Sequence, residues 1–189
     1  MLVFLFKKMS KKLLALSMCA FIGTKSVLAA TMTRGEYNEY RGWQIPENED
    51  PSEQGYLVEY LDGGKPCDER HKGYISWSPA CVFKDAYRQN GAMTFSDALT
   101  LLKQGKRVAR SGWNASNQWL SVSNQNTAQV KAENFWSPHN REFAEHNGGQ
   151  ATVMPCITIK NAQDQIQMGW VPSQGDLFST DWMIVEAPV

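Results

Sequence analysis

Cysteine is scarce in this sequence of 189 residues, and its spacing excludes two of its common uses. The cysteines are Cys19, Cys67, Cys81 and Cys156. None forms a CxxC pair, and no cysteine–histidine cluster has the spacing of a zinc site. A hairpin would bring Cys67 and Cys81 together as a disulfide, but independent reduced thiols are the favoured interpretation.

Positive charge is also sparse over most of the chain. The 19 basic residues balance 19 acidic ones, but residues 1–30 hold five of the lysines and no acid. Residues 31–189 are therefore acidic, whereas a nucleic-acid polymer requires clustered positive charge on its partner. The apolar run at residues 13–23 is too short for a helix that spans a bilayer. We expect neither a nucleic-acid polymer nor a membrane as a partner.

Signature motifs of catalysis are missing as well. The sequence has no GxSxG, P-loop, GxGxxG or HExxH motif. We predict solvated surface side chains for the three histidines, which are His71, His139 and His146. Cys156 follows a proline in an apolar stretch, which favours a buried structural thiol. Asp176 and Asp181 could serve in acid–base catalysis, but the sequence offers them no partner base or metal site. The prediction is a protein that is not an enzyme, with no cofactor and no metal.

Two interpretations of residues 1–30 remain open. A lysine-rich segment, a short apolar run and the small residues at 27–29 have the order of a secretory signal, which would predict export. Alternatively, residues 21–43, with Met32-Thr33-Arg34-Gly35-Glu36-Tyr37, resemble the start of many phage and prophage proteins. Translation would then begin at Met18 rather than Met1, the protein would be cytoplasmic in the host cell, and the signal-like segment would be partly a native first strand. The cytoplasmic interpretation is favoured.

The first module is predicted at residues 31–91. Gly55–Tyr60 alternates as a strand does, and 73–77 forms the returning strand after a glycine turn. Ser78-Pro79 then predicts the start of a helix, whose inner face holds Val82, Phe83, Ala86 and Tyr87.

The second module is predicted at residues 92–189. Thr94-Phe95-Ser96-Asp97 resembles a capping box, and Phe95, Ala98, Leu99 and Leu102 form one apolar stripe of a helix that Gly105 ends. Strands follow at 106–112, 119–122, 156–161, 165–171 and 179–185, and a polar insertion at 124–149 holds a short helix. The fold class is α+β, with small, mostly antiparallel sheets, short helices and two modules.

Tryptophan supplies the strongest indication of a binding site. Trp113 and Trp170 stand beside turn residues, where an indole makes a stacking platform for a nucleobase. Polar groups for a base edge or a ribose follow at Asn114, Ser173, Gln174 and Asp176. Arg107 and Arg110 offer charge for a phosphate. The residues alone favour the other interpretation, in which the tryptophans fill the core and the asparagine serves a turn.

A family resemblance changes this balance. Residues 93–114, which end in Ser111-Gly112-Trp113-Asn114, resemble the opening of the Thoeris anti-defence 2 family. Residues 169–182, which begin Gly169-Trp170-Val171-Pro172-Ser173-Gln174-Gly175-Asp176, resemble its end. Residues 155–160 match its middle strand, so the resemblance covers about half of the chain.

The resemblance implies a phage protein that sequesters a cyclic nucleotide signal of the glycocyclic ADP-ribose type without cleaving it. It further implies a homo-oligomer, typically a tetramer, with ligand pockets between protomers. The positions that carry over as ligand-binding residues are Trp113, Asn114, Trp170, Ser173, Gln174 and Asp176. Ala115 and Gly175 depart from the family's usual glycine and threonine, which leaves the ligand's identity open. The alternative is a phage or prophage accessory module, structural or protein-binding, with no small ligand.

Overall fold

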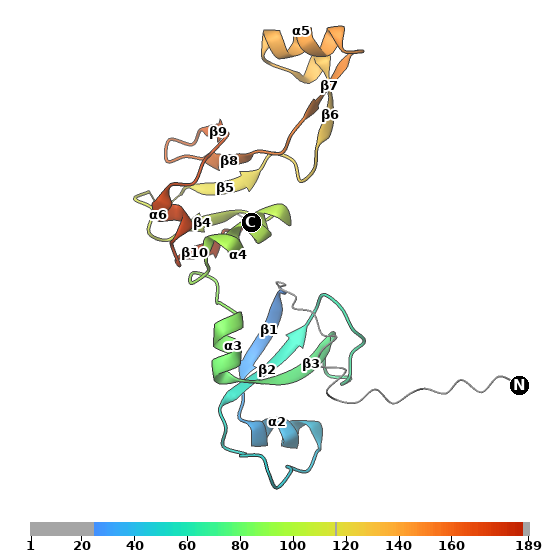
Figure 1. Ribbon diagram of the computed structural model, residues 1–189, viewed down its shortest axis with the longest axis vertical. Coiled ribbons are helices and arrows are strands. Elements are labelled where there is room, and N and C mark those ends of the chain that lie inside the picture. Colours follow the sequence, from blue (N-terminus) through green and yellow to red (C-terminus); the bar gives the residue numbers. More distant parts are fainter. Residues whose placement is uncertain (1–24, 116, 187–189) are drawn as a thin grey trace, which may run out of the picture. The chain divides into compact units, whose positions relative to one another are not determined.

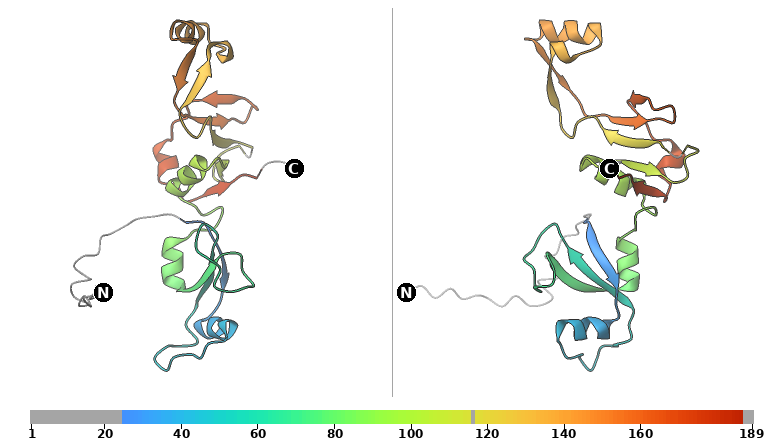
Figure 2. Two further views of the ribbon diagram at one scale, coloured as in Figure 1. Left: turned by 90° about the vertical axis from the view of Figure 1, so that its right-hand side faces the viewer. Right: turned by 180° about the vertical axis from the view of Figure 1, so that it is seen from behind.

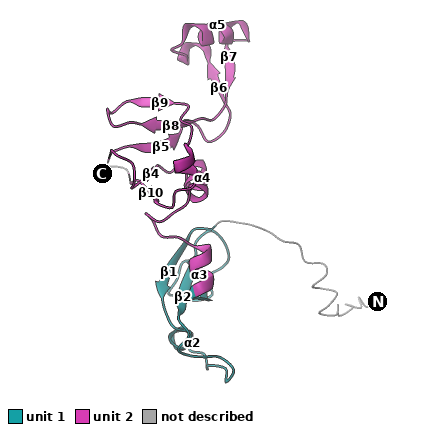
Figure 3. Cartoon of the chain, turned by 60° about the vertical axis from the view of Figure 1, so that its left-hand side comes forward, with its two compact units in different colours: residues 1–80 teal, residues 81–189 magenta. Residues whose placement is uncertain are grey.

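The computed structural model describes residues 25–115 and 117–186. The chain divides into two compact units, residues 1–80 and 81–189 (Figure 3). All the strand pairs in both units are antiparallel, and five α-helices accompany them among the described residues. The α+β class predicted from the sequence is confirmed. The predictions for residues 1–24, including the start at Met18, lie outside the described residues.

The first unit is built on a three-stranded sheet of order β1-β2-β3 (Figure 1). Its strands are β1 (Val27–Thr31), β2 (Gly55–Tyr60) and β3 (Tyr74–Pro79). The residues that form the small-residue segment of the predicted signal therefore lie in β1, where Ala29 pairs with Val58. Gly55 is required by a close approach, because a Cβ at this position would collide with the ring of Trp77.

Helix α2 (Arg34–Arg41) connects β1 to β2 and was not predicted from the sequence. Its signal was available, because Thr33 and Glu36 form a capping box in which each side chain bonds the other's backbone. The helix ends at Gly42, whose φ of 67° is the left-handed conformation that glycine adopts easily.

Helix α3 (Ala80–Ala86) corrects the predicted helix start and inner face. Strand β3 continues through Ser78 and Pro79, so these residues do not cap the helix. Val82 is 56% exposed and Ala86 is also exposed. Phe83 and Tyr87 are half-buried and their rings stack, with centroids 4.9 Å apart.

The second unit is built on a five-stranded sheet of order β10-β4-β5-β8-β9 (Figures 1 and 2). The strands are β4 (Val108–Arg110), β5 (Trp119–Val122), β8 (Ile157–Lys160), β9 (Ile166–Met168) and β10 (Trp182–Ile184). Helix α4 (Phe95–Lys103) packs against β10, β4 and β5. Their shared core consists of Met93, Ala98, Leu102, Val108, Leu120 and Trp182.

The polar insertion forms a small subdomain between β5 and β8. Strands β6 (Ala128–Lys131) and β7 (Gln150–Val153) pair, and they are joined by the 3-10 helix η1 (Ala132–Asn134) and helix α5 (Pro138–His146). Its core is separate from that of the sheet and contains Ala132, Ala144 and Ala151 with Phe135. The predicted start of α5 is confirmed, but the two strands were not predicted.

Candidate functional site

The predicted site lies where the loop after β4 meets the chain that follows β9. Trp113 comes from the first segment, and Trp170, Ser173 and Asp176 come from the second, which includes helix α6 (Gln174–Leu177). The antiparallel pairing of β4 with β10 brings the segments together, since Arg110 lies opposite Trp182. Residues more than 50 positions apart in sequence therefore meet at one end of the sheet.

Three tryptophans form the aromatic part of this site. The ring centroid of Trp113 lies 6.3 Å from that of Trp170 and 5.6 Å from that of Trp182, and all three rings meet edge to face. Trp182 is fully buried, whereas Trp113 and Trp170 are half-buried and pack against the sheet's core. Such edge-to-face contacts hold aromatic rings at fixed angles. Sequence reasoning did not place Trp182 in the site.

Asp176 links two of these tryptophans through hydrogen bonds. Its Oδ1 accepts from Nε1 of Trp113 at 3.1 Å and from Nη1 of Arg110 at 2.8 Å. Its Oδ2 accepts from Ser173, from the backbone N at 3.0 Å and from Oγ at 2.7 Å. Its backbone carbonyl accepts from Nε1 of Trp182 at 3.1 Å. This residue thus fixes the orientation of two indoles.

Asp181 completes the polar part of the site. Arg110 donates from Nε to Asp181 Oδ1 at 2.8 Å, and the backbone N of Gly112 donates to Oδ2 at 2.7 Å. Ser179 also donates to this carboxylate. Arg110 therefore joins two acidic side chains, and the charge that was expected to serve a phosphate is already neutralised within the protein.

The pKa values of both carboxyl groups lie well below their usual range. Burial raises the pKa of Asp176, but hydrogen bonds from Arg110, Ser173 and Trp113 outweigh it and bring the pKa to about 2. A hydrogen bond from Arg110 is the main cause that lowers the pKa of Asp181 to about 2. Both groups are consequently ionised at neutral pH.

The remaining predicted residues differ in their surroundings. Ser173 caps helix α6 in a capping box with Asp176. Asn114, which directly follows Trp113, and Gln174, the first residue of α6, are exposed. The exposed apolar residues Val171 (80%) and Phe178 (81%) lie on the same segment of chain. Arg107 instead places its guanidinium 5.2 Å from the ring centroid of Trp119.

Other chemistry-bearing residues also have defined places. Cys67, Cys81 and Cys156 are free thiols, and Cys156 is half-buried beside Ser123 rather than fully buried. His139 and His146 are exposed, as expected. His71 corrects the prediction of a solvated histidine, because its side chain is 13% exposed and bonds to Glu59 and Tyr40. Within residues 25–115 and 117–186, no group of three or more His, Cys, Asp or Glu has a metal-binding arrangement.

Comparison with known proteins gives concordant results for the second unit. A family model described as Thoeris anti-defense 2-like domain matches residues 93–185. The chain is also 38% identical over 93 residues to a protein of Bacillus phage SP01 named Thoeris anti-defense 2. That alignment covers 49% of this chain and 94% of the phage protein. No helix of the described ranges combines the length and apolar character needed to cross a bilayer.

Proposed function

Because residues 93–185 make this chain a member of the Thoeris anti-defense 2 family, we propose that it counteracts Thoeris defence by binding a cyclic nucleotide signal. The signal proposed is of the glycocyclic ADP-ribose type, and the protein holds it without cleaving it. The observation that carries this proposal is the cluster of Trp113, Trp170 and Trp182. Asp176 accepts hydrogen bonds from Trp113 and Trp182, and Trp170 meets both of these rings edge to face.

The aromatic surface suits a nucleobase. Stacking of a base on an indole contributes about 1–3 kcal/mol. A protein that sequesters the signal must compete for it with the effector that the signal activates, which requires tight binding. A nanomolar dissociation constant corresponds to a binding free energy of about −12 kcal/mol. Two stacking contacts and several hydrogen bonds reach this range most readily when the binding surface is preformed. The fixed indole orientations supply such preformation.

Beside the two stacking tryptophans, the four polar residues among the six predicted ligand-binding residues divide into two roles in this proposal. Asn114 and Gln174 are exposed and present amide groups for a base edge or a ribose hydroxyl. Asp176 receives four hydrogen bonds on its carboxylate from within the protein, and Ser173 supplies two of them. We therefore assign Asp176, held by Ser173, to positioning of Trp113 and Trp182.

The electrostatics favour capture over catalysis. A general acid or base works best with a pKa near the operating pH. The carboxyl groups of Asp176 and Asp181 have pKa values of about 2 and are held by Arg110, so neither is poised to exchange a proton at neutral pH. Both groups serve better as fixed anchors of the binding surface.

A homo-oligomer, with a tetramer as the expected form, is part of the proposal. Val171 and Phe178 expose large apolar areas next to the tryptophans, and the edge strand β9 exposes Ile166 and Met168. Exposed apolar groups beside an open strand edge favour burial against another chain. A second copy would cover them and enclose the ligand between protomers, in the cytoplasm of the infected host cell.

A second candidate function is an accessory structural or protein-binding module without a small ligand. The observation that favours it is the complete burial of Trp182 and the packing of Trp113 and Trp170 against the same core. In this case the cluster stabilises the fold and presents no binding surface. Substitution of Trp113 would then lower stability, and no nucleotide would bind.

Isothermal titration of the full chain with glycocyclic ADP-ribose isomers and a panel of cyclic dinucleotides tests the proposal. The ligand is afterwards released by heat and analysed by chromatography. We expect tight binding, intact release, and at least about tenfold weaker binding by Asn114→Ala and Gln174→Ala. Trp136→Ala, at a site that is 86% exposed on the insertion, is the matched control. A degraded ligand would indicate an enzyme, and folded protein that binds no compound would favour the accessory module.

A further inference from the structure

The first unit contains a pocket of about 760 Å³ that shares no residue with the site described above. This volume is within the range of about 300–1,000 Å³ that is usual for small-molecule sites. Helix α2, the segment after it and strand β3 supply the walls. Four of the lining side chains are aromatic, namely Tyr37, Trp43, Tyr74 and Trp77. Among the described lining residues there is no Leu, Ile, Val or Met, so the pocket suits a planar polar molecule better than an aliphatic chain.

Trp43 provides the accessible aromatic surface. The guanidinium of Arg41 covers one face of its ring at 4.3 Å from the centroid, and the residue is still 53% exposed. Trp77 is a fixed wall, because Arg34 lies 4.2 Å from its ring centroid and its Nε1 donates to the carbonyl of Met32 at 2.9 Å. The pocket is therefore lined by one exposed indole, Trp43, and one anchored indole, Trp77.

The charges around the pocket are balanced. Arg34 lies 3.1 Å from Glu49 and 2.9 Å from Glu53. Arg41 lies 3.9 Å from Asp68, which itself binds Arg70 at 2.6 Å. Both lining arginines are thus already paired with acidic side chains, and Glu49 itself lines the pocket, so the electrostatics favour a compound of little net charge over one with several phosphates. Asn38 and Gln44 add amide groups of the kind that recognise base edges.

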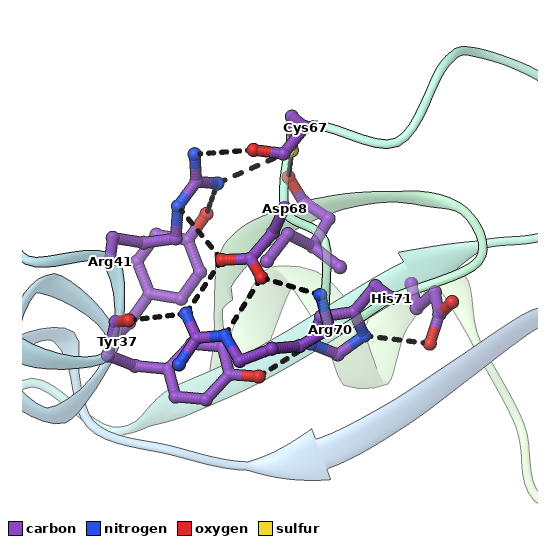
Figure 4. A network of polar contacts seen from close by, with 9 residues as sticks. Tyr37, Arg41, Cys67, Asp68, Arg70 and His71 are labelled. Atoms are coloured by element: carbon purple, nitrogen blue, oxygen red, sulfur yellow. Dashed lines mark hydrogen bonds and ion pairs between the residues drawn. The ribbon is translucent and has the colours of Figure 1, made fainter.

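The part of the pocket wall that Tyr37, Arg41 and Cys67 form is ordered by hydrogen bonds within the protein (Figure 4). Arg41 donates from Nη1 to the hydroxyl of Tyr37 at 3.2 Å and from Nη2 to the carbonyl of Cys67 at 3.3 Å. In the same loop, His71 bonds both Glu59, at 2.9 Å, and Tyr40, at 2.8 Å. Such a network lowers the ordering cost of binding.

We propose that this pocket is a second ligand site, specific for nucleosides, with the base stacked on Trp43 and its edge bonded by the amides. It is separate from the family site in residues 93–185. Its ligand is recognised through base and ribose, without a contribution from a polyphosphate.

The test is a titration of the full ¹⁵N-labelled chain with adenosine, guanosine, cytidine, uridine and, for comparison, ATP, followed through the indole Nε1–H resonances. We expect at least one nucleoside to shift the resonances of Trp43 and Trp77 and to leave those of Trp113, Trp170 and Trp182 in place. Trp43→Leu should weaken this binding about tenfold or more, which is the loss expected for one stacked base. Trp136→Leu, which lies outside the pocket, should bind as the parent chain does.

Three results would overturn the proposal. One is no shift of Trp43 or Trp77 with any nucleoside up to its solubility limit. Another is binding of ATP without binding of adenosine, which would indicate recognition of phosphate. A third is a shift confined to Trp113 and Trp170, which would place the nucleoside in the family site. If Trp43→Leu fails to fold, Gln44→Ala, at an exposed lining position, decides the question in its place.

Discussion

At the scale of single residues, Asp176 is the group on which most of the candidate site depends. Replacing it with alanine leaves Nε1 of Trp113 without its acceptor and Arg110 with one carboxylate instead of two. Loss of one member of a mostly buried ion pair and of its hydrogen bonds costs about 3 kcal/mol. We expect Asp176→Ala to lower the free energy of unfolding by this amount in a urea titration followed by tryptophan fluorescence.

Two further variants sharpen this experiment. Asp176→Asn retains an acceptor for Trp113 but loses the charge, so its destabilisation should be smaller than that of the alanine variant. Glu145→Ala removes an exposed carboxylate from α5 and should change stability by less than about 0.5 kcal/mol. Equal unfolding midpoints for Asp176→Ala and Glu145→Ala would show that the hydrogen bonds of Asp176 do not stabilise the fold.

The same two carboxyl groups predict how stability depends on pH. Asp176 and Asp181 have pKa values of about 2 in the folded protein, against about 3.9 in an unfolded chain. Between these values the unfolded state binds more protons, so stability rises with pH. Their contribution is fully present above about pH 4 and is lost as the pH falls towards about 2.

Asp181→Asn should therefore show a shallower loss of stability between pH 4 and pH 2 than the parent chain. The measurement is the urea midpoint at a series of pH values, with Glu145→Ala again as the control. Identical slopes in the parent chain and Asp181→Asn would contradict the assigned pKa.

Much of the candidate site was predictable from local sequence and from resemblance, but its hydrogen bonds and ion pairs were not. Trp113, Trp170, Ser173 and Asp176 do come together. The role of Arg110 as a bridge to Asp181 depends on the pairing of β4 with β10, which lie more than 70 residues apart. A local pattern carries no information about such a partner, so the arginine was assigned to a phosphate instead.

At the scale of secondary-structure elements, capping explains which helices begin where the sequence indicates. Thr94 bonds Asp97 through both its backbone N, at 2.8 Å, and its Oγ1, at 2.6 Å. We expect Thr94→Ala to destabilise the second unit by about 1 kcal/mol, the usual effect of losing such a cap. Thermal unfolding followed by circular dichroism measures it.

Ser137 is the matched control, because it occupies the N-cap of α5 without making a side-chain cap hydrogen bond. Ser137→Ala should change the unfolding temperature little. An equal effect of the two substitutions would mean that the Thr94 side chain contributes nothing specific to the start of α4.

The elements with regular periodicity were predicted well, and those set by tertiary pairing were not. The capping box and apolar stripe placed α4, and alternation placed β2. Strands β6 and β7, AQVK and QATV, alternate apolar and polar residues over only four positions each. They were missed because so short a pattern is weak by itself, and they exist through pairing with each other. Ser78-Pro79 was misplaced because Pro79 takes the last position of β3, opposite Gly55.

At the scale of the whole molecule, the chain combines a family domain at residues 93–185 with a first unit that lies outside that match. The division into modules at residues 31–91 and 92–189 stays a prediction. Each of the two proposed ligand sites belongs to one unit, because all its residues come from that unit alone. Binding at the two sites can therefore be measured independently on one intact chain, through different tryptophans.

The insertion offers the largest change that the family domain should tolerate. Its core of three alanines and Phe135 is separate from the core around Trp182. Strands β5 and β8 remain paired up to its boundaries, where the backbone N of Ser123 donates to the carbonyl of Cys156 at 2.9 Å. Since antiparallel strands close naturally through a two-residue turn, Asn-Gly should replace residues 124–155 without disturbing the sheet.

We expect this shortened chain to keep the indole Nε1–H shifts of Trp113, Trp170 and Trp182 in an ¹⁵N correlation spectrum. Ala144→Asp provides the companion test, because a carboxylate at this fully buried alanine should unfold the insertion without shortening the chain. Both variants should preserve the three resonances, since the contacts among these rings involve no residue of 124–155. If the three resonances instead collapse to random-coil positions in both variants, the sheet and its tryptophan cluster depend on the insertion. The two cores then fold as one cooperative unit.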